Sequence, residues 1–456
     1  MVINKKEFDP VRGAVIEILG LVESGRFTAA DAIQMAVENN KSFTPLDIRF
    51  IRQLANGVTK MKRRLDHDMR FFLSKPSEKM SQRLIDVLRL GFFQLFFTDR
   101  IPAAAAVSES VNLARHFCDP ARARLVNAVM RSALRHPEWI VFRQKDDDPV
   151  GYLGNHYSYP DWFVEYCLSE FKYEETEKIL AEMNRPPTIS LRVNPIKADV
   201  EDVEKNLTKA GIAFTKGKYL PEFYHLEEGS FPDEEQLVKS GKIYIQDESA
   251  GMVVRLMNPK TGSNVLDLAA APGGKASYAA VRMHNKGMIT AVDKSRVRLE
   301  LLMENCKRLG IKIVNPVLAD NLEFKGGPFD RVILDVPCSG WGNAGRHSDL
   351  RWMKTEENVE KLFKVQSAMM DKAAKLVKPG GVLVYSTCTI IRKENDEVVE
   401  EFLLRHDDFI LESAAEYFEG DVVSERGFLK TYPNKTNLAG AFGARLKKKI
   451  KTGSKG

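Results

Sequence analysis

Two cysteines in the second half of the chain stand where covalent chemistry on a ligand is expected. Cys338 lies in the run Asp-Val-Pro-Cys-Ser-Gly that begins at Asp335, and Cys388 lies in the run Tyr-Ser-Thr-Cys-Thr that begins at Tyr385. Each run ends or follows a short apolar stretch that predicts a buried strand. Free cysteines are often buried fillers, but the carboxyl edge of such a sheet is where α/β folds bind ligands.

Methylation of a cytosine ring at carbon 5 is a reaction that would use two such thiols. Carbon 5 of cytosine is a poor nucleophile, and a thiolate that adds to C6 makes C5 enamine-like and able to attack a methyl sulfonium. We assign this addition to Cys388, whose pKa must then be lowered by its surroundings. Asp335 would hydrogen-bond the base at N3 and N4, and Cys338 would assist when the C5 proton leaves and the thiolate is expelled. The base must also be unstacked, which costs roughly a few kcal/mol in a duplex and less in a loop.

A glycine turn suited to a nucleotide lies upstream of both cysteines. Val265–Leu268 reads as a buried strand, and the chain from Lys275 reads as a helix. The loop between them consists of Ala269, Ala270, Ala271, Pro272, Gly273, Gly274 and the helix-opening Lys275. Its glycines allow a tight turn and the close approach of a ligand. Strand, glycine turn and helix are typical of the nucleotide pocket of a doubly wound sheet, and the spacing excludes a Walker loop.

Three aspartates are expected at the carboxyl ends of strands around this turn. Asp293 follows the glycines by about 20 residues, where a ribose-binding carboxylate is expected. Asp320 could accept from an adenine amine, and Asp335 ends the strand before Cys338. Each alone suits a helix cap, but three together favour a nucleoside pocket whose charge Lys275 partly neutralises. These positions resemble those of S-adenosylmethionine-dependent methyltransferases, which implies that cofactor and no metal.

A sheet must hold these side chains, and strand and helix patterns alternate from residue 265 onward. Strands are expected at 265–268, 288–292, 314–318, 330–335 and 381–386, and helices at 275–283, 295–309, 356–376 and 394–405. The rhythm predicts a parallel α/β sheet. A helix is also expected to begin near residue 247, with Asp247 or Ser249 as its cap.

The front of the chain has a different character. Residues 5–137 carry apolar residues at three- and four-residue spacing, which predicts helices throughout, including one stretch over 46–73 and an N-cap at Thr44 before Pro45. Residues 140–240 mix short strands and helices and predict a small α+β module. One helix is strongly basic, which usually means a solvated face and alternatively an RNA contact. Its basic residues are Arg52, Lys60, Lys62, Arg63 and Arg64.

Length and composition limit the classes of protein to which the chain can belong. The 456 residues suggest two or three domains, and no apolar run approaches the roughly 20 residues that span a bilayer. The first ten residues do not read as a secretory signal. The five scattered cysteines argue against a disulfide framework or zinc cluster and for a reducing cytoplasm. A net charge of +6 permits a nucleic-acid partner without requiring one.

Two parts of the sequence resemble known families. The runs at 88–95, 101–102, 106–114 and 125–131 resemble the NusB-type RNA-binding helical domain. The two cysteine runs resemble those of the RNA 5-methylcytosine methyltransferases. Together they make the whole chain similar to the bacterial RsmB (Fmu/Sun) family, part of the RsmB/NOP methyltransferases, which acts on 16S ribosomal RNA. In that family the Thr-Cys cysteine is the nucleophile and the Pro-Cys cysteine aids product release, roles that correspond to Cys388 and Cys338.

The resemblance implies a multidomain fold and a set of partners. We expect a NusB-like all-α domain over 1–140, a small α+β module over 141–240, a Rossmann-like methyltransferase domain over 241–450 and a basic tail over 451–456. The expected partner is 16S rRNA or a small-subunit assembly intermediate, bound by a monomer without a membrane. Cofactor residues correspond to 269–275, Asp293, Asp320 and Asp335, and Arg298 matches a family arginine near the cofactor.

The sequence departs from the family in places, and other functions stay open. Ser348 replaces a usual proline in the segment at 346–352, and Ala439–Leu446 is a weakened form of the family's closing motif. These departures concern substrate contacts. A tRNA cytosine-C5 methyltransferase is the hardest rival to exclude. A DNA cytosine methyltransferase would not need Cys388. The third alternative is a non-catalytic RNA-binding or antitermination-type factor.

Overall fold

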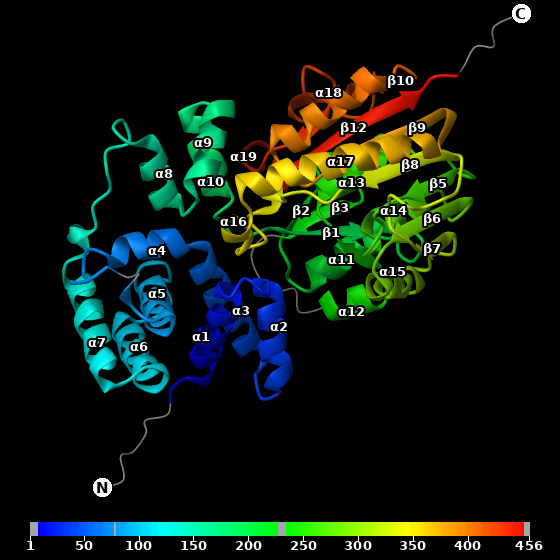
Figure 1. The fold of residues 1–456 in the computed structure, drawn as a ribbon. Coiled ribbons are helices and arrows are strands. Elements are labelled where there is room, and N and C mark those ends of the chain that lie inside the picture. Colours follow the sequence, from blue (N-terminus) through cyan, green and yellow to red (C-terminus); the bar gives the residue numbers. More distant parts are fainter. Residues whose placement is uncertain (1–7, 77–78, 227–233, 451–456) are drawn as a thin grey trace, which may run out of the picture. The chain divides into compact units, whose positions relative to one another are not determined.

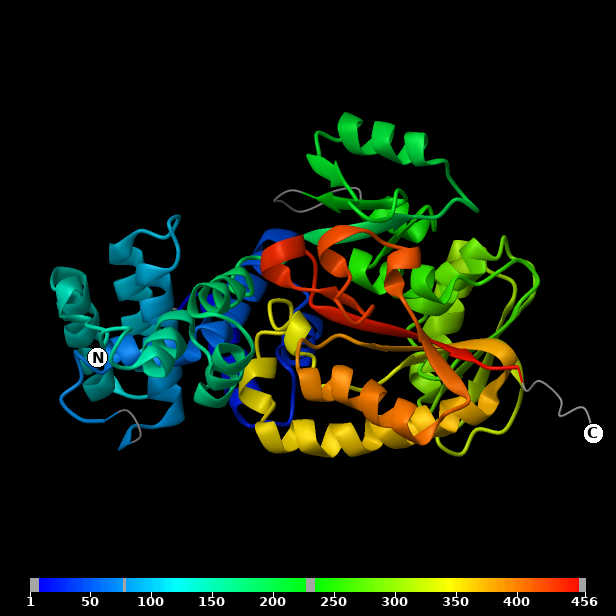
Figure 2. The same cartoon turned by 90° about the horizontal axis from the view of Figure 1, so that it is seen from above.

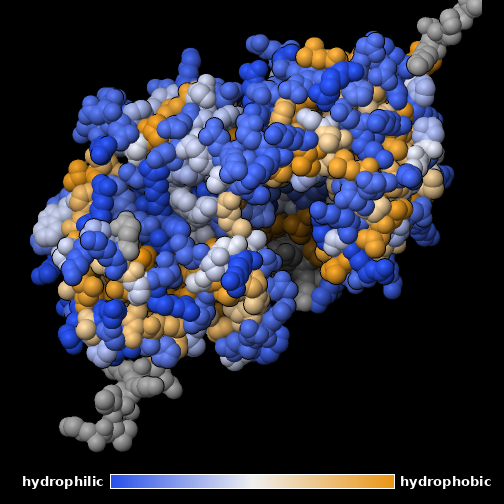
Figure 3. All heavy atoms as spheres, viewed as in Figure 1, coloured by the Kyte–Doolittle hydropathy of each residue, from blue (hydrophilic) through white to orange (hydrophobic). Residues whose placement is uncertain are grey.

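A computed structural model describes residues 8–76, 79–226 and 234–450 (Figure 1). The chain forms two compact units, one of Met1–Arg185 with Ala344–Thr355, the other of Pro186–Asn343 with Glu356–Gly456. The tail expected at 451–456 lies outside the described residues. Hydrophilic residues cover much of the face in Figure 3, with hydrophobic residues scattered among them. Across the described ranges, every helix is too short or too polar to cross a bilayer.

The first unit is built of helices, as expected from the apolar spacing. They are α1 (Pro10–Glu23), α2 (Ala29–Asn39), α3 (Pro45–Lys60), α4 (Lys62–Met69), α5 (Gln82–Phe96), α6 (Ala103–Phe117), α7 (Pro120–Arg135), α8 (Pro149–Tyr157), α9 (Asp161–Glu170), α10 (Tyr173–Glu182) and α16 (Leu350–Met353). The N-cap at Thr44 is confirmed and forms a capping box with Asp47. The single helical stretch expected over 46–73 is wrong, because the backbone of Met61 leaves the helical region and separates α3 from α4.

The basic residues of α3 and α4 mostly serve the first unit itself. Lys60 donates to the backbone of residue 345, and Lys62 pairs with Glu23 at 2.8 Å. Arg63 pairs with an aspartate at 2.6 Å, and Arg64 pairs with another at 2.8 Å. Arg52 is the exposed member of the set. Most of the basic side chains that could have contacted RNA are therefore bound to partners within the protein.

The second unit contains a small antiparallel sheet of order β2-β3-β1-β4. Its elements are β1 (Ile189–Val193), α11 (Val200–Lys209), β2 (Phe214–Lys216), β3 (Phe223–Leu226), α12 (Glu234–Lys239) and β4 (Ile243–Ile245). The fully buried Arg192 of β1 donates to Gln246 Oε1 at 2.7 Å, to Gly274 O at 3.2 Å and to Ser277 Oγ at 3.1 Å. These bonds join the module to the glycine turn.

A larger sheet of order β10-β12-β9-β8-β5-β6-β7 forms the body of this unit, with β11 paired to β12. Its strands are β5 (Asn264–Asp267), β6 (Met288–Asp293), β7 (Val314–Leu318), β8 (Phe329–Asp335), β9 (Val377–Thr387), β10 (Phe409–Glu412), β11 (Leu429–Thr431) and β12 (Ala441–Lys448). Strands β5 to β9 pair in parallel, as expected. Strands β10 to β12 are antiparallel additions that the sequence reading missed.

Helices cover both faces of this sheet, which confirms the α/β class. They are α13 (Glu248–Met257), α14 (Gly274–Arg282), α15 (Arg296–Leu309), α17 (Glu356–Leu376), α18 (Asp396–Arg405) and α19 (Pro433–Thr436). One apolar core lies under α13, α14 and α15, and a second lies under α17 and α18 (Figure 2). Burial on both faces explains the near-continuous apolar strands. The loops at the carboxyl ends of β5, β6, β8 and β9 carry the candidate site.

Candidate active site

The two cysteines lie side by side. Cys338 follows β8 and Cys388 follows β9, and these strands pair in parallel with Asp335 opposite Ser386. The Sγ atoms are 3.2 Å apart, and the backbone N–H of Cys388 points to Cys338 Sγ at 3.4 Å. Cys388 is exposed and Cys338 is partly buried. The expectation that one sheet edge carries both thiols is confirmed.

Their surroundings separate the two thiols chemically. The pKa of Cys388 is lowered, because Cys338 donates a hydrogen bond to its thiolate and Lys275 adds positive charge. The pKa of Cys338 is raised well above its ordinary value by the same hydrogen bond and by burial. Cys388 is therefore the more acidic thiol of the pair and Cys338 the less acidic one, which is the order that addition by Cys388 requires.

Buried polar side chains brace the two cysteine loops. Glu394 is fully buried and accepts from the backbone N–H of Ser339 at 2.8 Å and from Gln366 at 2.9 Å. Ser339 Oγ lies 3.0 Å from Thr389 Oγ1, so the residues after each cysteine touch. Asn395 donates to Thr389 O at 2.9 Å. Sequence reasoning missed these braces, because a Glu-Asn pair at the start of a helix gives no signal of what it binds.

Asp335 ends β8, just before the Cys338 loop, and takes part in a network of charged side chains. Its carboxylate accepts from Lys275 Nζ at 2.6 Å and from Ser386 Oγ at 2.8 Å. Burial disfavours the charged form of Lys275, but Asp335 outweighs it and raises the pKa of Lys275 above its ordinary value. The ion pair therefore places the positive charge of Lys275 directly beside Asp335 at the carboxyl end of β8. Lys275 was expected to neutralise part of the charge of the three aspartates, and the aspartate that it pairs with is Asp335.

Asp267 is a further acid that the sequence reading left out. It ends β5 and is 1% exposed, and burial together with Asp335 raises its pKa to about 7. Its Oδ2 is a buried acceptor with no hydrogen-bond donor among the described residues. The signal was present, since Asp267 follows Val265 and Leu266 at the end of the first strand. A ligand that brings a donor to this loop would satisfy the oxygen.

The glycine turn is held between β5 and α14. Gly273 has φ of 101°, a conformation that favours glycine, and it precedes the first residue of α14. Arg298 donates to Ala271 O and lies 3.4 Å from Asp293 Oδ2. Asp293 is buried at the end of β6, and its Oδ1 accepts from the Ser295 N–H at 2.9 Å. The turn, Arg298 and Asp293 therefore form one group.

Asp320 is placed less closely than expected. Strand β7 ends at Leu318, which pairs with Asp293, so Asp320 lies in the turn beyond the strand. Its Oδ1 accepts from the Leu322 N–H at 2.9 Å, and the residue is exposed. Asp320 therefore caps a turn, where the sequence allowed a helix cap. Within the described ranges, no three His, Cys, Asp or Glu residues gather to hold a metal ion.

The thiol pair predicts a pH profile. We expect iodoacetamide to modify Cys388 at neutral pH faster than an ordinary thiol, because its pKa is lowered. Cys338→Ala removes the hydrogen bond, so the pKa of Cys388 should rise and its alkylation near pH 7 should slow several-fold. Mass spectrometry of the peptide that carries Cys388 measures both rates. An unchanged profile in Cys338→Ala would show that the neighbouring thiol does not set this pKa.

Successive parts of the chain match known protein families. Residues 254–447 match the family described as 16S rRNA methyltransferase RsmB/F, residues 10–135 match the NusB family, and residues 159–230 match the ferredoxin-like domain of RsmF/B-like methyltransferases. The chain is 33% identical to the probable ribosomal RNA small subunit methyltransferase B of Bacillus subtilis, covering 88% of this chain and 89% of that protein. It is 34% identical to the Synechocystis protein of the same description, covering 91% and 94%.

Solved structures share the fold. The structure of PH0851 has 26% sequence identity and a TM-score of 0.78, and covers 97% of this chain and 99% of that chain. The structure of NSun6 from Pyrococcus horikoshii with SFG has 26% identity and a TM-score of 0.58, and covers 63% of this chain and 98% of that chain. The first similarity includes the helical front, and the second covers a smaller share of the chain.

Proposed function

Because the chain belongs to the 16S rRNA methyltransferase RsmB/F family, we propose that it transfers a methyl group from S-adenosylmethionine to C5 of a cytosine in 16S rRNA. The thiol pair carries this proposal: the sulfur of an exposed Cys388 lies 3.2 Å from that of Cys338, whose pKa is raised, at the sheet edge that also carries Asp335. A methyltransferase that alkylates a nucleophilic oxygen or nitrogen has no need of this pair. Methylation of cytosine C5 does need a thiol, because this carbon must first be activated by addition at C6.

The residues divide the reaction between them. The Cys388 thiolate adds to C6, and its electron pair makes C5 nucleophilic, while Asp335 accepts from the N4 amine and from N3 once N3 carries a proton in the adduct. C5 then forms its bond to the incoming methyl group. The C5 proton passes to solvent water, the electron pair of the C5–H bond re-forms the C5–C6 double bond, and the Cys388–C6 bond breaks with its electron pair returning to sulfur. Cys338, the neighbouring protonated thiol, assists this release by stabilising the departing thiolate.

The glycine turn fits S-adenosylmethionine on two observations. Gly273 turns the chain with φ of 101° just before α14, and Asp267 Oδ2 is a buried acceptor with no donor among the described residues. Asp293 would accept from the ribose hydroxyls and Asp320 from the adenine amine, with residues 269–275 and Arg298 around them. When bound, this cofactor supplies an electrophilic methyl group.

The test is methyl transfer from labelled S-adenosylmethionine to 16S rRNA, small-subunit assembly particles and tRNA in parallel. We expect label in ribosomal RNA, recovered as 5-methylcytosine after digestion and mass spectrometry. Label in tRNA alone would replace the substrate by the tRNA alternative. Cofactor-dependent label at another atom would overturn the C5 assignment. No transfer to any RNA would favour the non-catalytic RNA-binding alternative.

Removing Asp293 should weaken cofactor binding. Asp293→Ala deletes a charged acceptor for two ribose hydroxyls, and each such hydrogen bond contributes about 1.5–3 kcal/mol. We expect the Kd for S-adenosylmethionine to rise at least about tenfold by calorimetry, which corresponds to the lower bound of one such bond. Glu300→Ala, an exposed acid on α15, is the matched control. An unchanged Kd would move the ribose site elsewhere.

A further inference from the structure

Arg192 lies on β1 of the small antiparallel sheet, and its side chain reaches the glycine turn that we assign to the cofactor. Nη1 donates to Gly274 O at 3.2 Å, and Nη2 donates to Ser277 Oγ at 3.1 Å. Ser277 Oγ in turn donates to Gly274 O at 3.1 Å. Gly274 is the first residue of α14, so these bonds end on the helix that begins at the turn. The reaction proposed above gives Arg192 no role.

The guanidinium of Arg192 is fully buried between aromatic rings. Its central carbon lies 4.6 Å from the centre of the Tyr278 ring on α14 and 5.4 Å from the centre of the Tyr244 ring on β4. Nη1 also donates to Gln246 Oε1 at 2.7 Å. Burial lowers the pKa of Arg192 to about 10, so the group stays positively charged at neutral pH. The rings and the acceptors together fix the direction in which this charge points.

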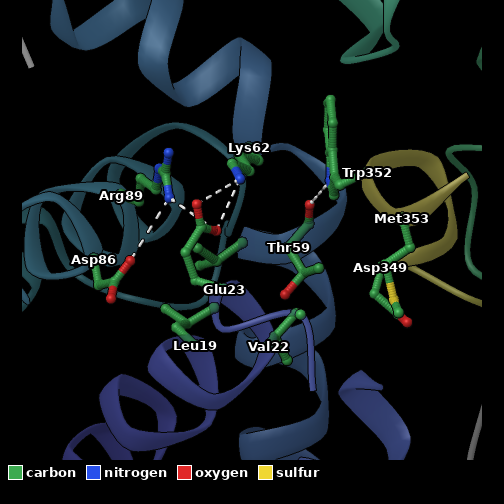
Figure 4. A pocket seen from close by; sticks show the side chains of 12 residues that line it. Leu19, Val22, Glu23, Thr59, Lys62, Asp86, Arg89, Asp349, Trp352 and Met353 are labelled. Carbon is green, nitrogen blue, oxygen red and sulfur yellow. Dashed lines mark hydrogen bonds and ion pairs between the residues drawn. The ribbon is translucent and has the colours of Figure 1, made fainter. Parts of the chain in front are cut away.

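A buried arginine of the first unit is balanced in a different way. Arg89 lines a cavity of about 120 Å³ and faces three carboxylates, those of Asp66 at 2.7 Å, Asp86 at 3.6 Å and Glu23 at 3.8 Å, of which Figure 4 shows the last two. The bonds of Arg192 go instead to an amide, a hydroxyl and a backbone carbonyl. A buried charge is a weak source of stability, because apolar groups of similar volume often do as well. We therefore expect the main effect of Arg192 to be on the position of its acceptors.

The first turn of α14 carries groups on which the proposed site depends. The Ser277 N–H donates to Gly273 O at 2.8 Å, so the residue that accepts from Arg192 also closes the glycine turn. Lys275 lies between the two residues that Arg192 contacts, and its Nζ donates to Asp335 at 2.6 Å. A shift of this helical turn would therefore move both the cofactor loop and Lys275.

We propose that Arg192 is a positioning residue for the cofactor turn, and that the small module is thereby a required part of the S-adenosylmethionine site. The inference rests on the proposed function in taking this turn as the place of the cofactor. Without the guanidinium, the first turn of α14 loses two hydrogen bonds to the module and can adopt other arrangements. The cofactor then binds only the fraction of molecules in which the turn is correctly placed, and the apparent affinity falls by that fraction.

The test compares full-length Arg192→Met with Asn194→Ala as the matched control. Asn194 is also fully buried and donates to Leu309 O at the end of α15 at 2.8 Å, so its loss loosens the module away from the glycine turn. We expect the Kd for S-adenosylmethionine, measured by calorimetry, to rise about tenfold in Arg192→Met, as for a turn correctly placed in about a tenth of the molecules. Asn194→Ala should keep the Kd of the wild type.

Amide hydrogen exchange of the cofactor-free protein gives a second readout. Residues 274–282 should exchange faster in Arg192→Met and at the rate of the wild type in Asn194→Ala. A role confined to stability would lower the melting temperature of both variants and leave the Kd and this exchange unchanged, which would overturn the proposal. If Arg192→Met does not fold, Ser277→Ala serves in its place, because it removes one acceptor and suits a helix. It should raise the Kd several-fold, and an unchanged Kd would again overturn the proposal.

The proposed reaction can fail separately from this inference. A wild type that binds S-adenosylmethionine but transfers no methyl group to cytosine C5 would defeat the proposed reaction, and the Kd values of the variants would still decide the role of Arg192. A wild type that does not bind S-adenosylmethionine would overturn both.

Discussion

Cys388→Ala is expected to abolish methyl transfer, with a loss of rate on the order of 10⁴-fold or more, because it removes the sulfur that forms the covalent bond to C6. No protein–RNA adduct should form. Cys338→Ala should instead accumulate an adduct, since addition still occurs and release is slowed. Denaturing gels of enzyme with RNA and labelled cofactor display both outcomes as a shifted, labelled band.

Cys306→Ala is the matched control, because that thiol is buried in the core away from the sheet edge. It should transfer methyl groups like the wild type and leave no stable adduct. Retained activity in Cys388→Ala would make Cys338 the nucleophile and reverse the two roles. Adduct in neither cysteine variant, with activity intact, would exclude covalent catalysis through this pair.

Asp335→Asn should have the next largest effect. The substitution keeps the shape of the side chain and removes the negative charge that Lys275 Nζ approaches at 2.6 Å. The base would lose its charged acceptor, and positioned acid–base groups contribute about 10²–10⁴-fold to rates. We expect single-turnover methyl transfer to slow by that order while the fold and the Cys388–Cys338 contact persist.

Asp330→Asn tests whether this loss is specific. Asp330 lies on the same strand, pairs with Lys378 and accepts from the Asn264 N–H at 2.8 Å. It should keep the rate of the wild type. Equal losses in both variants would indicate damage to β8 and not removal of a catalytic acceptor.

Local patterns predicted the parts of this molecule that repeat simple rules. The alternation of apolar runs and helices predicted β5 to β9 within a few residues, because strands buried on both faces must be apolar. Strands β10 to β12 escaped, since they are antiparallel additions formed by residues far along the chain. The break at Met61 escaped for a similar reason: the apolar spacing continues across it, and tertiary contacts decide where the helix divides.

In the candidate site, too, some features could be predicted from the sequence and others could not. Parallel strands bring their carboxyl ends to one edge, so the adjacency of Cys338 and Cys388 followed from their strands. Their unequal acidity did not follow, because it depends on a hydrogen bond between two side chains distant in sequence. The braces at Glu394 and Gln366 and the hydrogen bonds of Arg351 to Ser158 and Tyr159 are also long-range contacts. Residue type and spacing alone do not reveal such contacts.

The interrupted course of the chain also bears on how this protein can evolve. A segment of one unit is encoded inside the other, between residues 343 and 356. Tyr159 and Thr59 form a seat for residues 351–352, because Arg351 donates to Tyr159 Oη at 2.9 Å and Trp352 donates to Thr59 O at 2.6 Å. Recombination that moved residues 1–185 as a cassette would leave Arg351 and Trp352 behind without this seat. Exchange of residues 1–185 as one cassette is therefore expected to disrupt these contacts. The two halves are expected to diversify together, by point substitution on both sides of that seat.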